Sequence, residues 1–409
     1  MNGAARGKAL RAAFYRHRLN NHRESPMSSL MLKVVLLRMT ENQASDCFIS
    51  AGAPIYFKTK GHAVPIDDRL MESDAIKEMA YGVLTEQQIK TFETTYELNF
   101  ALVLPNQGNF RINLFRQRAT VAMAVRYIPF DTPSLESLGL PVLLREHIME
   151  KRGLILVVGA TGAGKSTTLA AMLNYRISHH DGHVLTLEEP VEYLFRHGKS
   201  IVNQRDVGSD AHSYHAALKS ALRQSPDCLM IGEIRDHIAM TAAINFALSG
   251  HLCVATLHAN NSYHALTRII NMYPQDNRQG LLQDLSVSLK SIIAQRLITD
   301  DRQDRIPAVE ILTNATHIRE LIETGDLGHI REAMQKSLRL DMQTFDRALQ
   351  RLYEAGRITR QTALDNADSP TNLSLMLTTP PLAEKRAPPK SDSTDFGDIQ
   401  LIYGDDGKA

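Results

Sequence analysis

Two different patterns of apolar and polar positions divide the chain near residue 150. From about Leu30 to Pro133, short strand-like runs stand between helical segments, which is typical of a small α+β domain. The runs at 99–104 and 109–115 flank Pro105-Asn106-Gln107-Gly108, whose turn-forming residues predict a hairpin. A third strand is expected at 120–128.

Beyond Arg152 the pattern changes to short, continuously apolar runs, each followed by glycine or polar residues and then by helical periodicity. These runs are Leu154–Val158, Val184–Leu187, Cys228–Ile231 and Leu252–Thr256. Strands that are apolar at every position are covered on both faces, so the pattern predicts a parallel sheet in an α/β domain. Helical sequence is expected to continue over 275–297 and 317–357.

Changes in composition predict five segments. Residues 1–26 hold six basic residues against one acid, Glu24, and are expected to be a disordered extension or to precede the working start at Met27 or Met31. Prolines punctuate a linker between the two domains, and prolines mixed with charges predict a disordered tail. The expected segments are an extension at 1–26, an N-terminal domain at 27–133, a linker at 134–145, an α/β domain with C-terminal helices at 146–365, and a tail at 366–409.

Charge and cysteine content narrow the classes of function. The chain has 46 Lys+Arg and 45 Asp+Glu, and this near balance argues against a protein that grips nucleic acid non-specifically. Three separated cysteines favour a reducing compartment over a disulfide scaffold or a thiolate zinc site. The longest run without charges, His237–Thr267, contains histidines and asparagines and is broken at Ser249-Gly250, so it does not read as a membrane span.

The sharpest chemical signal is Gly159–Ser166, which fits GxxxxGK[ST] at every position. It follows the apolar run 154–158 and opens a helix, which is the context that a phosphate-binding loop requires. Its backbone N–H groups and the helix N-terminus would cradle the phosphates of ATP, Lys165 would reach the β- and γ-phosphates, and the Ser166 hydroxyl would bind Mg²⁺. The expected nucleotide-binding residues are Gly159, Ala160, Thr161, Gly162, Ala163, Gly164, Lys165, Ser166 and Thr167.

Three other strand-like runs also end in reactive side chains. Glu233 follows 229–231, Glu188 and Glu189 follow 184–187, and His258 follows 252–256. Because the carboxyl ends of parallel strands meet at one edge of a sheet, we expect these groups near the γ-phosphate. A carboxylate such as Glu233 can orient or deprotonate the attacking water there. His258, and His251 before the same run, could each be a hydrogen-bonded histidine of the core or a residue of the site. The pattern favours the site only slightly.

These motifs resemble the PilT/PilU branch of the secretion-superfamily ATPases, the motors of type IV pilus retraction. The resemblance covers residues 45–364 and is closer to PilU, because 252–261 and the long tail look like that branch. The departure of 317–322 from the AIRNLIR motif of PilT also favours PilU. It implies a Walker A motif at 159–166 and an aspartate box at 186–192, with Glu189 where aspartate is usual. It also implies a Walker B motif at 230–236 with Glu233 as the catalytic residue, and a histidine box at 250–261 that includes His258. Arg111 and Arg126 are implied as sensors of the γ-phosphate across a subunit interface.

The resemblance also implies the architecture and the partners. It indicates a RecA-like P-loop ATPase domain with a smaller α+β, PAS-like N-terminal domain, in a homohexamer that turns ATP and water into ADP and phosphate with Mg²⁺. The expected partners are a paralogous retraction ATPase and an inner-membrane platform protein, with no nucleic acid. The expected location is cytoplasmic, peripheral at the inner face of the inner membrane, where the motor powers or assists retraction and twitching motility.

Three other classes compete with this interpretation. A secretion or pilus-assembly ATPase of the same superfamily often carries a tetracysteine zinc insertion, for which this chain has no cysteine pair. A RecA-like DNA motor would need a basic surface, yet the chain is slightly acidic after residue 26. A non-catalytic, nucleotide-responsive scaffold would not need Lys165, Ser166 and Glu233 together.

Overall fold

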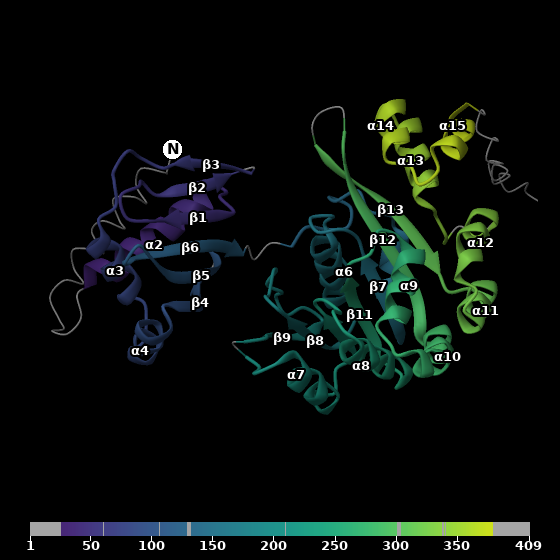
Figure 1. Cartoon of the computed structure of the whole chain (residues 1–409), viewed down its shortest axis with the longest axis horizontal. Coiled ribbons are helices and arrows are strands. Elements are labelled where there is room, and N and C mark those ends of the chain that lie inside the picture. The colour runs from purple at the N-terminus through teal and green to yellow at the C-terminus, as the bar shows by residue number, and fades with distance from the viewer. Residues whose placement is uncertain are drawn as a thin grey trace, which may run out of the picture. The chain divides into compact units, whose positions relative to one another are not determined.

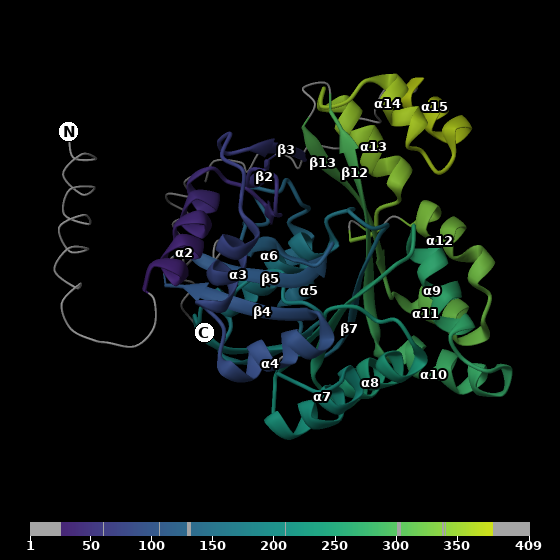
Figure 2. The same ribbon diagram turned by 60° about the vertical axis from the view of Figure 1, so that its left-hand side comes forward.

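The computed structural model describes residues 26–378, with gaps at 60, 106, 129–131, 209, 301–303, 338 and 340. These residues fall into two compact units, and Figures 1 and 2 label their helices and strands. The larger unit contains residues up to 298 together with 305–344, and the smaller one contains 299–304 and the residues from 345 onward. The expected extension before residue 26 lies outside the described residues.

The first part of the larger unit is a six-stranded antiparallel sheet with the strand order β3-β2-β1-β6-β5-β4. Its elements are α2 (Pro26–Glu41), β1 (Asp46–Ile49), β2 (Tyr56–Thr59), β3 (His62–Pro65), α3 (Ser73–Tyr81), α4 (Glu86–Thr95), β4 (Glu97–Leu104), β5 (Gly108–Gln117) and β6 (Thr120–Ile128). The predicted hairpin is confirmed by β4 and β5, and the predicted third strand by β6, which pairs with β5.

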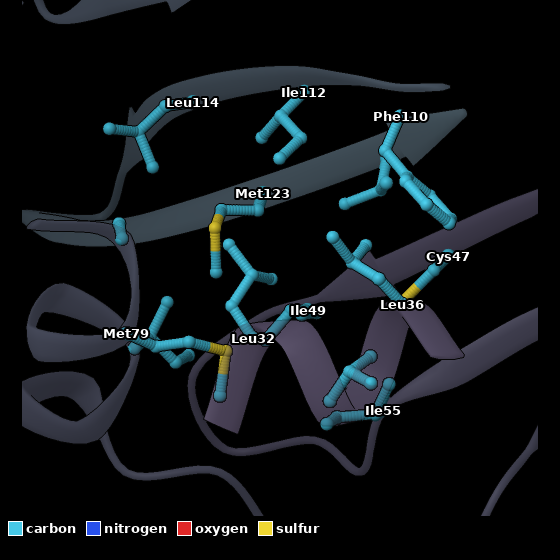
Figure 3. Packing of buried hydrophobic residues seen from close by; sticks show 14 of the residues in the cluster. Leu32, Leu36, Cys47, Ile49, Ile55, Met79, Phe110, Ile112, Leu114 and Met123 are labelled. Atoms are coloured by element: carbon cyan, nitrogen blue, oxygen red, sulfur yellow. The ribbon is translucent and has the colours of Figure 1, made fainter. Parts of the chain in front are cut away.

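The core of this part forms where α2 lies against the sheet. Leu32 and Leu36 are one helical turn apart and fully buried, and in Figure 3 they point toward side chains of the sheet. Along β5 every second residue is buried, because alternate side chains of a strand face opposite sides. The buried set on this side is Phe110, Ile112 and Leu114, joined by Cys47, Ile49 and Met123 of the neighbouring strands.

The second part of the larger unit is a seven-stranded sheet with the order β13-β12-β7-β11-β10-β8-β9. The run from β12 to β9 is parallel, as the sequence predicts. Its elements are α5 (Leu143–Ile148), β7 (Gly153–Val158), α6 (Lys165–His179), β8 (Gly182–Glu188), β9 (Ser200–Asp206), α7 (Tyr214–Ala221), η2 (Leu222–Gln224), β10 (Cys228–Ile231), α8 (His237–Leu248), β11 (Leu252–Leu257), α9 (Ser262–Asn271), η3 (Gln275–Asn277), α10 (Arg278–Ser288), β12 (Leu289–Thr299), β13 (Arg305–Thr313), α11 (Thr316–Thr324), η4 (Leu327–His329) and α12 (Ile330–Lys336).

The helix expected over 275–297 is wrong in its second half. Helix α10 ends at Ser288, and residues 289–299 form strand β12 beside β7. The β-branched pair Ile292 and Ile293 is buried there against Leu156 and Val157. The periodicity of a short apolar run does not distinguish a buried helix from a buried strand. Here the run forms a strand because β7 is available to pair with it.

The smaller unit contains α13 (Phe345–Glu354), α14 (Arg360–Asp365) and α15 (Pro370–Thr378). The disordered tail expected from residue 366 is therefore wrong up to 378. The buried Asp346 carboxylate accepts hydrogen bonds from the Asp368 and Ser369 backbone N–H groups at 2.8 and 3.4 Å, and Leu373 is fully buried. Residues 379–409 lie outside the described part. None of the helices in that part is both long and apolar enough to span a membrane.

Candidate nucleotide site

The loop between β7 and α6 has the backbone geometry of a phosphate cradle. Gly162 and Gly164 adopt the left-handed conformation, with φ of 79° and 84°, and Gly164 is the N-cap of α6. The buried Lys165 ammonium donates hydrogen bonds to the carbonyl oxygens of Gly159 and Ala160 at 3.0 and 2.9 Å. Burial lowers the pKa of Lys165, while the nearby carboxylates of Glu233 and Glu192 oppose that shift. The loop therefore curls around its own lysine.

Strand β12 holds this loop through one polar side chain. The Gln295 amide donates to the Ala163 carbonyl at 2.8 Å, and its oxygen accepts from the Thr168 hydroxyl at 2.6 Å. A Cβ added at Gly159 would lie 2.6 Å from the Gln295 carbonyl oxygen, so glycine is required at this close approach. Gln295 was missed by the sequence analysis, since it lies in a run predicted to be helical.

Side chains from neighbouring strand ends form a continuous hydrogen-bonded chain at the loop. Lys165 Nζ lies 3.3 Å from His258 Nδ1, and His258 Nε2 lies 2.8 Å from Glu233 Oε1. An ammonium group can only donate, so Nδ1 accepts and Nε2 carries the proton that is donated to Glu233. The structure thus brings together three residues that the sequence predicted for the site. His251 precedes β11 instead, packs its ring against Phe246 at an interplanar angle of 37°, and lies away from this edge.

Arg235 extends this series of hydrogen bonds, and its role was not predicted from the sequence. Its Nε donates to Glu233 Oε2 at 2.9 Å, and its Nη1 donates to Glu189 Oε2 at 2.9 Å. These contacts with two carboxylates raise the pKa of Arg235, led by its hydrogen bond to Glu233. Arg235 lies inside the 230–236 segment that resembles a Walker B motif, but neither the motif nor the spacing from Glu233 shows that its side chain turns back toward that carboxylate.

The two adjacent glutamates after β8 lie in different environments. Glu188 is buried and accepts hydrogen bonds from the Thr186 hydroxyl at 2.8 Å and the Gln204 amide at 3.2 Å. Burial raises the pKa of Glu188 to about 7, and these hydrogen bonds oppose the shift. Glu189 is about half exposed and faces Arg235. Glu188 is therefore poised between its two protonation states near neutral pH, whereas Glu189 forms an ion pair.

A cavity of about 690 Å³ lies next to these residues at the carboxyl edge of the parallel strands. It is lined by Thr161, Gly162, Gly164, Lys165, Ser166 and Thr167 of the loop, and by Glu188, Glu189, Glu192, Tyr214, Glu233, Arg235 and His258, among others. The remaining predicted loop residues, Gly159, Ala160 and Ala163, supply carbonyl oxygens that hold the loop together. The volume and the cradle suit a nucleotide.

The two predicted sensor arginines form ion pairs elsewhere. Arg111 and Arg126 are directly opposite each other on β5 and β6. Arg126 Nε lies 3.0 Å from Asp46 Oδ1, and Arg111 Nη1 lies 3.5 Å from Asp206 Oδ2. Among the described residues that line the cavity, neither arginine is present. Their role at a nucleotide bound by another subunit stays a prediction.

Comparison with known proteins identifies the family. The profile of the type II/IV secretion system proteins matches residues 20–325. The chain belongs to this family.

The secretion-family relatives include pilus ATPases. The type IV pilus ATPase PilU of Pseudomonas aeruginosa is 44% identical over 344 residues, which cover 84% of this chain and 90% of the relative. The type IV pilus retraction ATPase PilT of the same organism is 35% identical over 329 residues, covering 80% and 96%. A crystal structure of the pilus retraction motor PilT with bound ADP has a TM-score of 0.78 and 37% identity, covering 86% of this chain and all of that one. These likenesses confirm the predicted PilT/PilU resemblance and the predicted fold.

Proposed function

We propose that this chain is an ATP-hydrolysing motor subunit that powers or assists type IV pilus retraction, with a role like that of PilU. The observation that carries the proposal is the hydrogen-bonded chain from Lys165 through His258 to Glu233, placed at a P-loop cavity in a chain similar to PilU and PilT over most of its length. This arrangement joins a phosphate-binding cation to a carboxylate that can act on water.

Each side chain has a distinct task in hydrolysis. Lys165, released from the carbonyls of Gly159 and Ala160, would bind the terminal phosphates that the loop N–H groups cradle. Glu233 would take the proton of the attacking water, and His258 would orient that carboxylate through Nε2–H. Ser166 lines the cavity, and its hydroxyl would hold Mg²⁺, which neutralises phosphate charge when bound with ATP.

The finer parts of the proposal rest on the family likeness. We propose a homohexamer at the cytoplasmic face of the inner membrane, in contact with a platform protein of the pilus machine and with a paralogous retraction ATPase. Ring assembly would bring the N-terminal domain of one subunit to its neighbour, where Arg111 and Arg126 could act on the neighbour's nucleotide.

Deleting this gene and that of its presumed paralogue, singly and together, tests the function. We expect pilus retraction to slow or fail in at least one deletion, and restoration by the wild-type gene but not by a Lys165→Ala copy. A double deletion that assembles no pili, or one whose pili retract at the wild-type rate while secretion is lost, would favour the assembly or secretion ATPase alternative. In vitro, the purified chain is expected to release phosphate from Mg²⁺–ATP and to elute as a hexamer.

A further inference from the structure

Arg235 bridges two carboxylates at the cavity that would otherwise repel each other. Its guanidinium contacts Glu233 and Glu189 at 2.9 Å each, and these two glutamates come from the ends of different strands, β10 and β8. Like charges at such a separation destabilise each other unless a cation lies between them. The planar fork of arginine suits this task, since its N–H groups point in fixed directions.

The two oxygens of Glu233 are thereby held by different donors. His258 Nε2–H contacts Oε1 and Arg235 Nε–H contacts Oε2, so the carboxylate can neither rotate nor swing without losing a hydrogen bond. A base held in one orientation before the substrate arrives needs less reorganisation in the transition state. Arg235 itself is more than half exposed, and only its contact with Glu189 ties its outer end to a second strand.

Resting on the proposed function, we propose that Arg235 is a positioning residue and that Glu189 is its anchor, a pair we call the Arg235–Glu189 tether. The tether orients Glu233 for hydrolysis. The Glu189 carboxylate contacts Arg235 Nη1 at 2.9 Å, and an aspartate at this position would place its carboxylate one methylene further back along the side chain. The length of this side chain, and not only its charge, is then required.

Steady-state ATP hydrolysis by the full chain tests the tether. We expect Arg235→Ala to lower kcat about tenfold while KM for ATP changes less than about twofold, because orientation of the base is lost and nucleotide binding is kept. Arg235→Lys should recover part of kcat, since an ammonium keeps the charge without the fork. Glu189→Asp should also lower kcat, and the Glu189→Asp/Arg235→Ala double variant should be no slower than Arg235→Ala alone. Arg223→Ala, an exposed arginine outside the cavity lining, is the matched control.

Several results would overturn the tether. One is an Arg235→Ala variant whose kcat equals that of the wild type. If its KM is raised at the same time, Arg235 binds nucleotide directly. Another is a double variant in which the two single losses of kcat multiply. If Arg235→Ala does not fold, as judged by its thermal melt, wild-type kcat in a folded Glu189→Asp overturns the proposal by itself. A wild-type chain without ATP hydrolysis would overturn the proposed function and the tether together, whereas an active wild type with an equally active Arg235→Ala would overturn the tether alone.

Discussion

At the scale of single residues, the site separates nucleotide binding from hydrolysis. Lys165 is the side-chain cation at the phosphate loop, so Lys165→Ala should weaken ATP binding by at least tenfold. Glu233→Gln keeps the size of the side chain and removes its basicity, so it should bind ATP as the wild type does and lose about 10²-fold or more in kcat. Fluorescent-nucleotide titration and phosphate release measure the two effects. Equal turnover of Glu233→Gln and wild type would remove Glu233 from the catalytic role.

Glu188 predicts a pH dependence of stability. Burial raises the pKa of Glu188 to about 7 from an ordinary value of 4.5, so the folded state binds its proton more tightly than the unfolded state does. The stabilisation from this group is full below pH 4.5 and is lost as the pH rises to about 7, at most roughly 3 kcal/mol. The Glu188→Gln side chain cannot ionise. The melting temperature of this variant minus that of the wild type should therefore increase from pH 5 to pH 8. A difference that stays constant with pH contradicts this assignment.

The residues that the sequence predicts correctly are those whose chemistry follows from local context. The P-loop, Glu233 and His258 each come directly after an apolar run, and parallel strands carry such residues to one edge. Gln295 and Arg235 could not be found this way. Gln295 acts through a strand that is distant in sequence, and Arg235 through a turn of its side chain back toward its own strand. Packing decides which distant strands pair and which way a side chain points. The local sequence pattern does not contain that information.

At the scale of elements, the β7–α6 turn depends on glycine. Gly164 has φ of 84°, and a Cβ there would lie 2.8 Å from Gln295 Nε2. Gly164→Ala should therefore destabilise the larger unit by about 1–2 kcal/mol and weaken ATP binding. Gly280→Ala is the matched control, since Gly280 lies inside helix α10 with open space around its Cα and should gain roughly 0.5–1 kcal/mol. Thermal melts with and without nucleotide measure both, and an equal effect of the two substitutions contradicts the argument.

The smaller unit makes a second prediction at this scale. Leu373 of α15 is fully buried, so Leu373→Ala should cost about 2–4 kcal/mol locally. Limited proteolysis should then cut within 345–378 while ATP hydrolysis by the larger unit continues. The exposed Leu375 of the same helix is the control, and Leu375→Ala should leave the digestion pattern unchanged. Matching patterns for both variants would mean that α15 does not stabilise this unit. Composition alone did not predict α15, because prolines nearby mask a helix that starts at Pro370.

At the scale of the whole molecule, the proposed ring predicts cooperation between subunits. An arginine that acts on a neighbour's ATP stabilises charge in the transition state and contributes roughly 10³–10⁵ in turnover. Arg111→Ala rings should therefore hydrolyse ATP very slowly while still binding it, as should Glu233→Gln rings. If Arg111 acts in trans, an interface between the two kinds of subunit can pair an intact Arg111 with an intact Glu233.

Mixing the two inactive variants decides between the trans and cis roles. In randomly mixed rings with equal amounts of each, about a quarter of the interfaces are complete, since a heterologous ring interface takes one side from each neighbour. Phosphate release should rise with mixing, peak near equal proportions, and fall to the level of the inactive proteins at either end. Mixing Glu233→Gln with Lys165→Ala is the control, because both defects lie on the nucleotide-binding side and every interface stays incomplete. If activity at every ratio equals that of the unmixed variants, Arg111 does not act across the interface, and its effect is confined to its own subunit, where it pairs with Asp206.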